Sequence, residues 1–226
     1  VDGLRESGRE DHVPFGLLAR AAFRRLRGAP AEAASDLREA EEIAEEIFSD
    51  LESGSWKSEY VGTKPDLSRT PMPRLDLYPN DRALLGAIQT SRGCPFQCEF
   101  CDIIVMNGRV PRTKSPAQLV AELEGLRIRG WKDMVFIVDD NFIGNKRKAK
   151  AMLRELIVWR TRTGAKMGFL TEASADLADD LELCELMVLA GFKKVFVGFE
   201  TPSLESLQEC RKMQNCRRDL VETVKM

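Results

Sequence analysis

Histidine is almost absent from this sequence: His12 is the only one among 226 residues. A single imidazole argues against histidine-based catalysis and against a zinc finger with mixed cysteine and histidine ligands. Long apolar runs are missing too, and none approaches the roughly 20 residues of a membrane-spanning helix. The first residues also lack the basic stretch and apolar run of a secretory signal. We therefore expect a cytoplasmic protein without a membrane-spanning segment.

An excess of charge of either sign is lacking as well. The 34 Lys and Arg residues nearly balance the 36 Asp and Glu residues, which gives a formal net charge of -2. Nucleic-acid-binding proteins commonly carry a positive excess, so we expect no nucleic-acid partner. Hydrophobic residues make up 43% of the chain and charged residues 31%, which is typical of a globular protein.

The six cysteines are unevenly spaced, which argues against a disulfide framework. Such frameworks spread their cysteines through short secreted chains. Here Cys94, Cys98 and Cys101 crowd together, which indicates metal binding. Cys184 is expected on the apolar side of its helix, in the protein core, and the remaining two cysteines are interpreted as incidental thiols. Those two are Cys210 and Cys216.

Two segments precede the part of the chain in which strand and helix patterns alternate. Residues 1–53 are rich in Ala and Glu and predict a helical segment. Residues 54–85 contain four prolines and few periodic apolar residues, which predicts a Pro-rich linker. From Gly86 onward short apolar runs alternate with helical patterns, so 86–226 is expected to form the main domain.

This alternation predicts an α/β fold with about four βα units. Strands are expected over 86–91, 134–138, 167–171 and 194–199. Helices are expected over 116–129, 146–162, 179–190 and 203–210. Ser115 and Gln118 predict a capping box, and glycines 130, 164 and 191 stand where three helices should end. Strands followed by helices imply a parallel sheet with right-handed crossovers, in an open sheet or in part of a barrel.

The motif that carries chemistry follows the first predicted strand. Residues 91–102 read Ser-Arg-Gly-Cys-Pro-Phe-Gln-Cys-Glu-Phe-Cys-Asp, a C-x3-C-x2-C pattern. Three thiolates on one loop can bind three irons of a cubane cluster. No fourth cysteine is nearby, so one iron would keep an open position, which is typical of a reactive site. A structural zinc site and chance clustering are the alternatives, although zinc would call for a fourth Cys or His close by.

A C-x3-C-x2-C motif in the first βα loop resembles the radical S-adenosylmethionine (SAM) superfamily. The resemblance implies a partial (β/α)6 barrel with a 4Fe–4S cluster on Cys94, Cys98 and Cys101. It also implies that SAM binds the open iron and is cleaved reductively to a 5′-deoxyadenosyl radical. That radical would serve hydrogen abstraction or methyl transfer on an unknown substrate. The electron would come from a donor such as a flavodoxin or ferredoxin.

Three further short sequence motifs extend the resemblance to one subgroup of this superfamily. They are Gly-Arg-Val-Pro-Arg at 108–112, Val-Asp-Asp-Asn-Phe at 138–142 and Gly-Phe-Glu-Thr-Pro at 198–202. With the cysteine motif they resemble the radical SAM subgroup that carries a cobalamin-binding domain, which includes methyltransferases and cyclases. The similarity runs from about residue 65 to the end of the chain.

The resemblance also bears on completeness. Residues 1–53 are too few for a cobalamin-binding domain, and 11–16 (Asp-His-Val-Pro-Phe-Gly) have the wrong spacing for its Asp-x-His-x-x-Gly motif. They are interpreted as a possible remnant of such a domain, and cobalamin binding by this chain is not expected. The family barrel has six βα units and four are counted here. The core over 86–226 is therefore expected to be truncated, with strand 194–199 at an exposed edge that favours self-association.

Many relatives carry a Gly-Gly-Glu-like motif that contacts the amino group of SAM after the second strand. Asp139, Asp140 and Asn141 stand in that place here. The resemblance implies that their oxygens accept hydrogen bonds from the SAM ammonium, since carboxylate and amide oxygens are suitable acceptors. The alternative is a strand-to-helix turn in which these side chains only cap the following helix.

Two later strand ends hold the other candidates for SAM binding. Glu172 and Ser174 follow the third strand and could bind the ribose or carboxylate of SAM, or form a simple turn. Glu200 follows the fourth strand and could line the SAM or substrate cavity, or cap the helix that begins near Ser203. The carboxyl ends of strands are where α/β active sites lie.

Three functions therefore compete. The first is a radical SAM enzyme. The second is a non-catalytic 4Fe–4S electron-transfer or scaffold protein, which would normally close its cluster with a fourth thiolate. The third is a zinc-binding interaction module. Iron and sulfide with a SAM-dependent electron paramagnetic resonance (EPR) signal would indicate the first, iron without a SAM response the second, and zinc the third.

Overall fold

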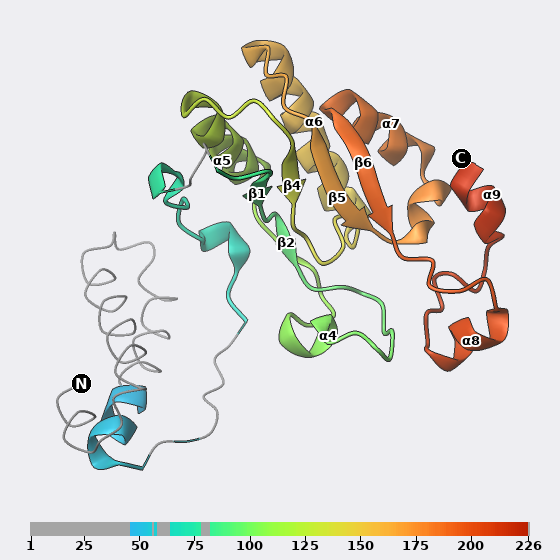
Figure 1. The fold of residues 1–226 in the computed structure, drawn as a ribbon, viewed down its shortest axis with the longest axis horizontal. Helices are drawn as coiled ribbons and strands as arrows, with labels where there is room; N and C mark the ends of the chain where they lie inside the picture. Colours follow the sequence, from blue (N-terminus) through green and yellow to red (C-terminus); the bar gives the residue numbers. More distant parts are fainter. Residues whose placement is uncertain (1–45, 56, 58–63, 78–81, 226) are drawn as a thin grey trace. The chain divides into compact units, whose positions relative to one another are not determined.

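The computed structural model describes residues 46–55, 57, 64–77 and 82–225 (Figure 1). It divides into two compact units, Val1–Pro65 and Asp66–Met226. In the first unit residues 46–53 are helical, at the end of the predicted helical segment. The rest of that prediction, and the upstream cobalamin-domain hypothesis with it, lies outside the described residues. Within the described residues, no helix is long and apolar enough to cross a membrane.

The second unit is built on a parallel sheet of four strands in the order β1-β4-β5-β6. The strands are β1 (Gly86–Ile88), β4 (Val135–Ile137), β5 (Phe169–Ala173) and β6 (Phe192–Val197). The helices between them are α5 (Pro116–Ile128), α6 (Lys146–Thr163) and α7 (Leu181–Ala190). Helix α5 packs against α6 and α6 against α7, so the three helices form one layer beside the sheet (Figure 1). The described residues therefore contain four βα units, as predicted.

The helix boundaries follow from local chemistry. At the start of α5, Ser115 Oγ accepts from Gln118 N at 3.2 Å and Gln118 Oε1 accepts from Ser115 N at 2.8 Å, which confirms the capping box. Gly164 ends α6 with φ 65° and Gly191 ends α7 with φ 97°. Both values are left-handed, where glycine lacks the steric penalty of a Cβ atom.

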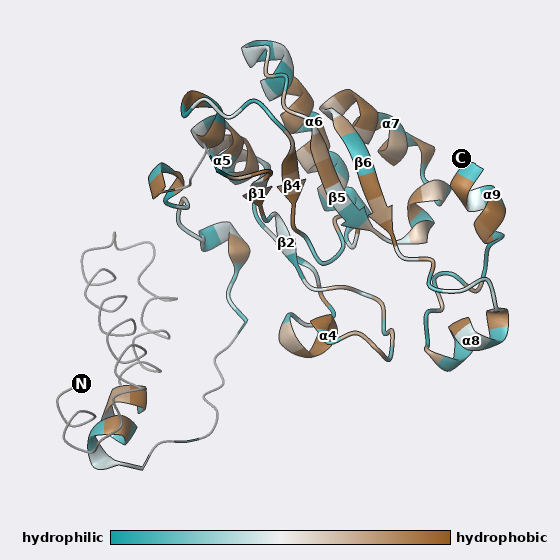
Figure 2. Ribbon diagram, in the orientation of Figure 1, coloured by the Kyte–Doolittle hydropathy of each residue, from teal (hydrophilic) through white to brown (hydrophobic). Residues whose placement is uncertain are grey.

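The hydrophobic core lies between the sheet and these helices. Figure 2 shows hydrophobic residues along β1, β4 and β5. The side chains of Leu153, Leu156 and Trp159 on α6 are at most 1% exposed. Phe192 contacts Phe169 and Phe142, with ring centroids 5.6 Å and 5.3 Å apart. This packing fixes the strands whose carboxyl ends carry the candidate site.

The predicted strand 86–91 is wrong in its second half. β1 ends at Ile88, and Ser91–Arg92 form a separate strand, β2, that pairs antiparallel with β3 (Arg112–Thr113). The reason is that the backbone N–H groups of Thr90 and Ser91 donate to the Asp139 carboxylate and not to a neighbouring strand. The chain thus leaves the parallel sheet just before the cysteines.

Part of the predicted linker packs onto the core. The short 3-10 helices Leu67–Arg69 and Leu75–Leu77 each bury a leucine. The side-chain amide of Gln118 donates to the carbonyl oxygens of Leu67 and Thr70, both at 3.2 Å. The second compact unit accordingly begins at Asp66, inside the segment predicted as a linker.

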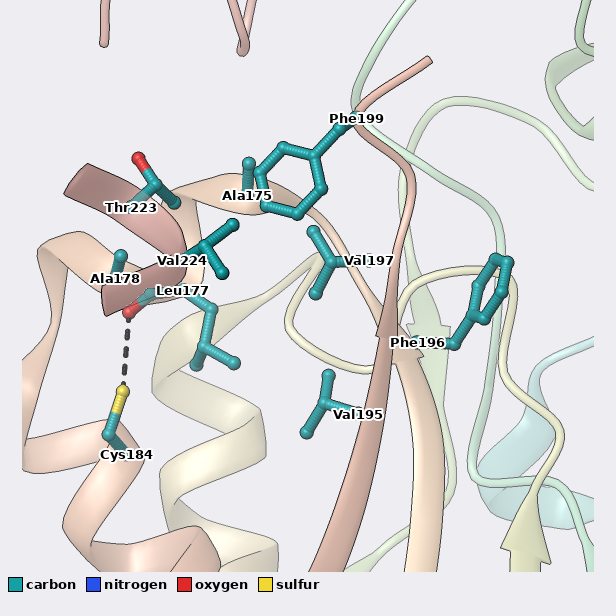
Figure 3. Close-up of a pocket in the computed structure, with 10 residues that line it drawn as sticks. All are labelled: Ala175, Leu177, Ala178, Cys184, Val195, Phe196, Val197, Phe199, Thr223 and Val224. Atoms are coloured by element: carbon teal, nitrogen blue, oxygen red, sulfur yellow. Dashed lines mark hydrogen bonds between the residues drawn. The ribbon is translucent and has the colours of Figure 1, made fainter. Parts of the chain in front are cut away.

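Strand β6 lies at one edge of the sheet, because it pairs only with β5 among the described strands. At this edge, β6, the 3-10 helix Ala175–Asp179 and α9 (Leu220–Lys225) border a cavity of about 390 Å³ (Figure 3). The cavity is mostly apolar, and Cys184 lies on its wall with its thiol donating to the Leu177 carbonyl oxygen at 3.6 Å. Its lining residues are Ala175, Leu177, Ala178, Cys184, Val195, Phe196, Val197, Phe199, Thr223 and Val224.

A buried ion pair joins the end of β3 to α5. Lys114 Nζ lies 2.6 Å from Glu122 Oε1, and the two side chains are 9% and 3% exposed. Burial raises the pKa of Glu122, although the Lys114 ammonium opposes the rise. Within the described residues, Glu122 Oε2 has no hydrogen-bond partner. The Glu122 carboxylate therefore depends on the Lys114 ammonium to offset the cost of burying its charge.

Lys114→Met should destabilise the fold by about 3–5 kcal/mol, because it leaves an uncompensated buried carboxylate. The double variant Lys114→Met/Glu122→Leu should recover much of that loss, since two apolar side chains need no partner. Arg127→Met removes the exposed partner of Glu124 on the same helix and serves as the control with a far smaller effect. Urea unfolding measures all three variants. A double variant no more stable than Lys114→Met would contradict the prediction.

Candidate functional site

The three clustered cysteines lie on the loop between β2 and β3, which also carries the short helix α4 (Ile103–Met106). Gly93 opens the loop with φ 104°, and a Cβ atom there would lie 2.8 Å from Gly108 O. Cys94 N donates to the same Gly108 oxygen at 3.2 Å. Glycine is therefore required where the two sides of the loop cross. Figure 1 shows the loop below the carboxyl ends of the strands.

The three sulfur atoms are close enough to influence one another. Cys98 is buried, and Cys94 and Cys101 are half-buried. Burial raises the pKa of the Cys94 thiol, and negative charge on Cys98 and Cys101 raises it further. A bound iron would favour the thiolate form of Cys94, because its positive charge opposes both effects.

The surroundings of the sulfurs fit a cluster. Asn141 Nδ2 donates to Cys94 Sγ at 3.8 Å, and Gln214 Nε2 donates to Cys98 Sγ at 3.4 Å. N–H donors to sulfur are among the groups that tune iron–sulfur clusters. No three His, Cys, Asp or Glu side chains of the described residues converge to hold a single ion. A cubane makes a different demand, because each thiolate binds its own iron.

Asp139 follows β4 and turns into the protein. Its carboxylate is 2% exposed and accepts hydrogen bonds from the backbone N–H and the hydroxyl of both Thr90 and Ser91. Burial raises its pKa, and the four donors oppose the rise. Strand alternation indicates this burial, because Val135, Ile137 and Asp139 share one buried face. The carboxylate thus holds the chain at the entrance of the cysteine loop.

Asp140 and Asn141 contact the cysteine loop from the same strand end. Asp140 Oδ2 accepts from Gly93 N at 2.6 Å and from Asn107 Nδ2 at 2.9 Å. Among the described residues none donates to its other oxygen, Oδ1. Asn141 Nδ2 also donates to Ser174 Oγ at 3.0 Å. The structure therefore brings the ends of β4 and β5 together beside Cys94.

The third and fourth strand ends hold the other predicted residues. Glu172 is exposed, and its carbonyl oxygen accepts from Phe142 N at 3.0 Å. Glu200 has φ 63°, a strained value for a residue other than glycine, and its carboxylate lies 2.7 Å from Lys212 Nζ. Ser203 caps α8 (Leu204–Glu209). Their roles toward SAM stay predictions.

The segment after α8 reaches the cysteine loop, which the sequence did not indicate. Glu99 N donates to Cys210 O at 2.9 Å, and Lys212 Nζ lies 5.5 Å from the centroid of the Phe100 ring. Gln214 contacts Cys98 from the same segment. The residues that meet here are more than 100 positions apart, so no local pattern could have revealed them.

Asp139→Asn should weaken the fold around the cysteine loop, because an amide offers one acceptor oxygen where four donors converge. Loss of charge-assisted hydrogen bonds costs about 1.5–3 kcal/mol. Urea unfolding of the cluster-free chain measures the loss. Asp133→Asn, at an exposed position before β4, is the control. Equal stability of the two variants would show that the hydrogen bonds of Asp139 do not contribute to the free energy of unfolding.

Residues 88–226 match the family model of the radical SAM superfamily. Over 161 residues the chain is 56% identical to the uncharacterized methyltransferase sll1242 of Synechocystis sp.. Over 160 residues it is 41% identical to the hopanoid C-2 methylase of Rhodopseudomonas palustris. Each match covers 71% of this chain and 30% of the relative, so the chain spans less than a third of these proteins.

Among solved structures, the chain matches the cobalamin-dependent SAM radical enzyme OxsB, which was solved with aqua-cobalamin and SAM bound. The TM-score is 0.61 at 20% identity, over 78% of this chain and 30% of OxsB. The match confirms the predicted α/β fold of the radical SAM partial-barrel type. The family model covers more than half of the chain, and the cysteine loop lies at the carboxyl ends of the strands. The chain therefore belongs to the radical SAM superfamily.

Proposed function

We propose that this chain is the catalytic core of a radical SAM methyltransferase. The observation that carries the proposal is the single loop between β2 and β3 that holds Cys94, Cys98 and Cys101 at the carboxyl ends of the strands. Two relatives, at 56% and 41% identity, are named a methyltransferase and a methylase, which favours methyl transfer over other radical reactions. The substrate stays open, and a cytoplasmic location stays a prediction from the sequence.

The chain's residues have separate roles in this proposal. Cys94, Cys98 and Cys101 would each bind one iron of a 4Fe–4S cluster, which supplies the electron for reductive cleavage of SAM when it is bound. Asp139 and Asp140 hold the loop that presents these thiolates to the strand ends. A flavodoxin or ferredoxin is the proposed electron donor.

SAM would contact the ends of the second, third and fourth parallel strands. Asp140 Oδ1 is the proposed acceptor for the SAM ammonium, because Oδ2 is occupied by Gly93 and Asn107. Asn141 and Ser174 join two of these strand ends through one hydrogen bond. Glu172 is exposed and is the proposed contact for the ribose or carboxylate of SAM. Glu200, whose carboxylate is paired with Lys212, is proposed to line the SAM or substrate cavity.

Cobalamin binding by this chain is not part of the proposal. The hypothesis that residues 1–53 are a remnant of an upstream cobalamin-binding domain stays a prediction, because the structure describes only 46–53 of them. The two alternative functions, a non-catalytic 4Fe–4S protein and a zinc-binding module, are decided by the same reconstitution that tests the main proposal.

The chain reconstituted without oxygen should hold about four irons and form 5′-deoxyadenosine from SAM when reduced. Cys98→Ala should lose most of the iron and all SAM cleavage, because the loop has no spare thiolate. Cys184→Ala removes a thiol outside the loop and should keep both. Bound zinc, or iron without SAM cleavage in the unaltered chain, would point to the alternative functions. A full, SAM-responsive cluster in Cys98→Ala would overturn the ligand assignment.

Asp140→Asn should keep the cluster but bind SAM about tenfold more weakly. The asparagine oxygen can still accept from Gly93 N, whereas the charged acceptor proposed for the ammonium is lost. Such a charge-assisted bond contributes about 1.5–3 kcal/mol, and 1.4 kcal/mol is a factor of ten. Equilibrium binding of SAM to reconstituted protein measures the change, with Asp133→Asn as control. Unchanged affinity at full iron content would limit Asp140 to holding the loop.

A further inference from the structure

We infer that Gln214 is a positioning residue for the cluster and raises its reduction potential through Cys98. The inference rests on the proposed function, because it concerns the cluster that the three cysteines would hold. It starts from one contact: Gln214 Nε2 donates to Cys98 Sγ at 3.4 Å. Cys98 is the middle cysteine of the motif and the most buried of the three.

The segment that carries Gln214 is fixed at several points. Arg218 Nε donates to the Gln214 carbonyl oxygen at 2.9 Å, and the Arg218 guanidinium is paired with Asp179 at 2.7 Å. Asn215 Nδ2 donates to the carbonyl oxygens of Gly198 and Phe199 at 3.1 Å and 3.2 Å. Gln214 therefore extends from a segment anchored to the ends of the sheet.

The same segment also contacts the loop beside Cys98. Glu99 N donates to Cys210 O at 2.9 Å, immediately after the buried cysteine. At the next loop residue, Lys212 lies over the Phe100 ring and pairs with Glu200. These two contacts hold the segment that carries Gln214 against the loop beside Cys98.

The orientation of the amide is consistent with donation to sulfur. Gln214 Oε1 is buried and, among the described residues, has no hydrogen-bond partner. An amide placed only for stability would satisfy its oxygen, because a buried unpaired acceptor is costly. The contact with Cys98 is thus the one hydrogen bond that the Gln214 side-chain amide makes within the described residues.

The physical effect follows from charge. A reduced cluster carries one more negative charge than an oxidised one, and part of it lies on the cysteine sulfurs. An N–H donor therefore stabilises the reduced state more than the oxidised state, and hydrogen bonds to sulfur are among the factors that set cluster potentials. Loss of the donor should move the midpoint potential in the negative direction.

The test compares two glutamines changed in the same way. Gln214→Met keeps the length of the side chain but removes the donor. Gln208→Met makes the same change at an exposed position of α8, six residues earlier. Both proteins are reconstituted without oxygen and titrated with a chemical reductant, and the EPR signal of the reduced cluster gives the midpoint potential. Iron content is measured in parallel.

The expected result is a more negative potential for Gln214→Met at unchanged iron content, with Gln208→Met equal to the unaltered chain. Equal potentials in all three proteins would overturn the inference. If Gln214→Met does not load iron, the melting temperature of its cluster-free form distinguishes a role in presenting Cys98 from a role in stabilising the fold. An unchanged temperature supports a role in presenting Cys98, and a lowered one assigns Gln214 to the fold and overturns the inference. Failure of the unaltered chain to load iron contradicts the proposed function itself.

Discussion

The carboxylate of Asp139 is the contact on which the rest of the site depends. It follows the central strand β4, is almost fully buried, and accepts four hydrogen bonds from Thr90 and Ser91. At those two residues the chain leaves the parallel sheet and enters the β2–β3 pair that frames the cysteines. Buried backbone N–H groups need acceptors. One carboxylate supplies them where strand pairing stops, and so sets the direction in which the loop departs.

The loop itself contains little regular structure, so side chains from other elements hold it in place. Asp140 accepts from Gly93 N at the entrance of the loop, and Asn141 donates to Cys94 Sγ. From the far end of the chain, Cys210 O accepts from Glu99 N and Gln214 contacts Cys98. These contacts converge because the carboxyl ends of parallel strands meet at one edge of a sheet. The order of the strands thus determines which side chains can reach the cysteines.

Much of this architecture could be predicted from local patterns. The helix caps at Ser115, Gly164 and Gly191 depend on neighbouring residues only, and they lie where the sequence places them. The cysteine motif is local as well. The division of the first strand was not predictable in this way, because it depends on Asp139, which lies 48 residues after Ser91. The contact of Gln214 with Cys98 could not be predicted from a local pattern, because the two residues are 116 positions apart in sequence.

Asp139 and Asp140 show how adjacent residues of one type come to differ in role. The alternation of β4 continues through the strand end, so Asp139 stays on the buried face with Val135 and Ile137. Asp140 lies on the other face, half-buried, with one oxygen bound to the loop and the other without a described donor. From the sequence, both residues are candidates for accepting a hydrogen bond from the SAM ammonium. Burial separates them: one supports the fold beneath the loop, and the other can support the loop and still offer a charged oxygen.

The remaining cysteines bear on whether the cluster site is open. An electron carrier commonly closes its cluster with a fourth thiolate. Cys210 is the thiol best placed for that, because its carbonyl oxygen already contacts the loop at Glu99. Its Sγ instead donates to the Leu207 carbonyl oxygen at 3.6 Å, within its own helix end, and Cys216 Sγ donates likewise to Lys212 O at 3.6 Å. Both thiols are directed at backbone carbonyls of their own segment. Neither thiol is thus directed at the cysteine loop, which agrees with the proposal that three cysteines bind the cluster and one position is left for SAM.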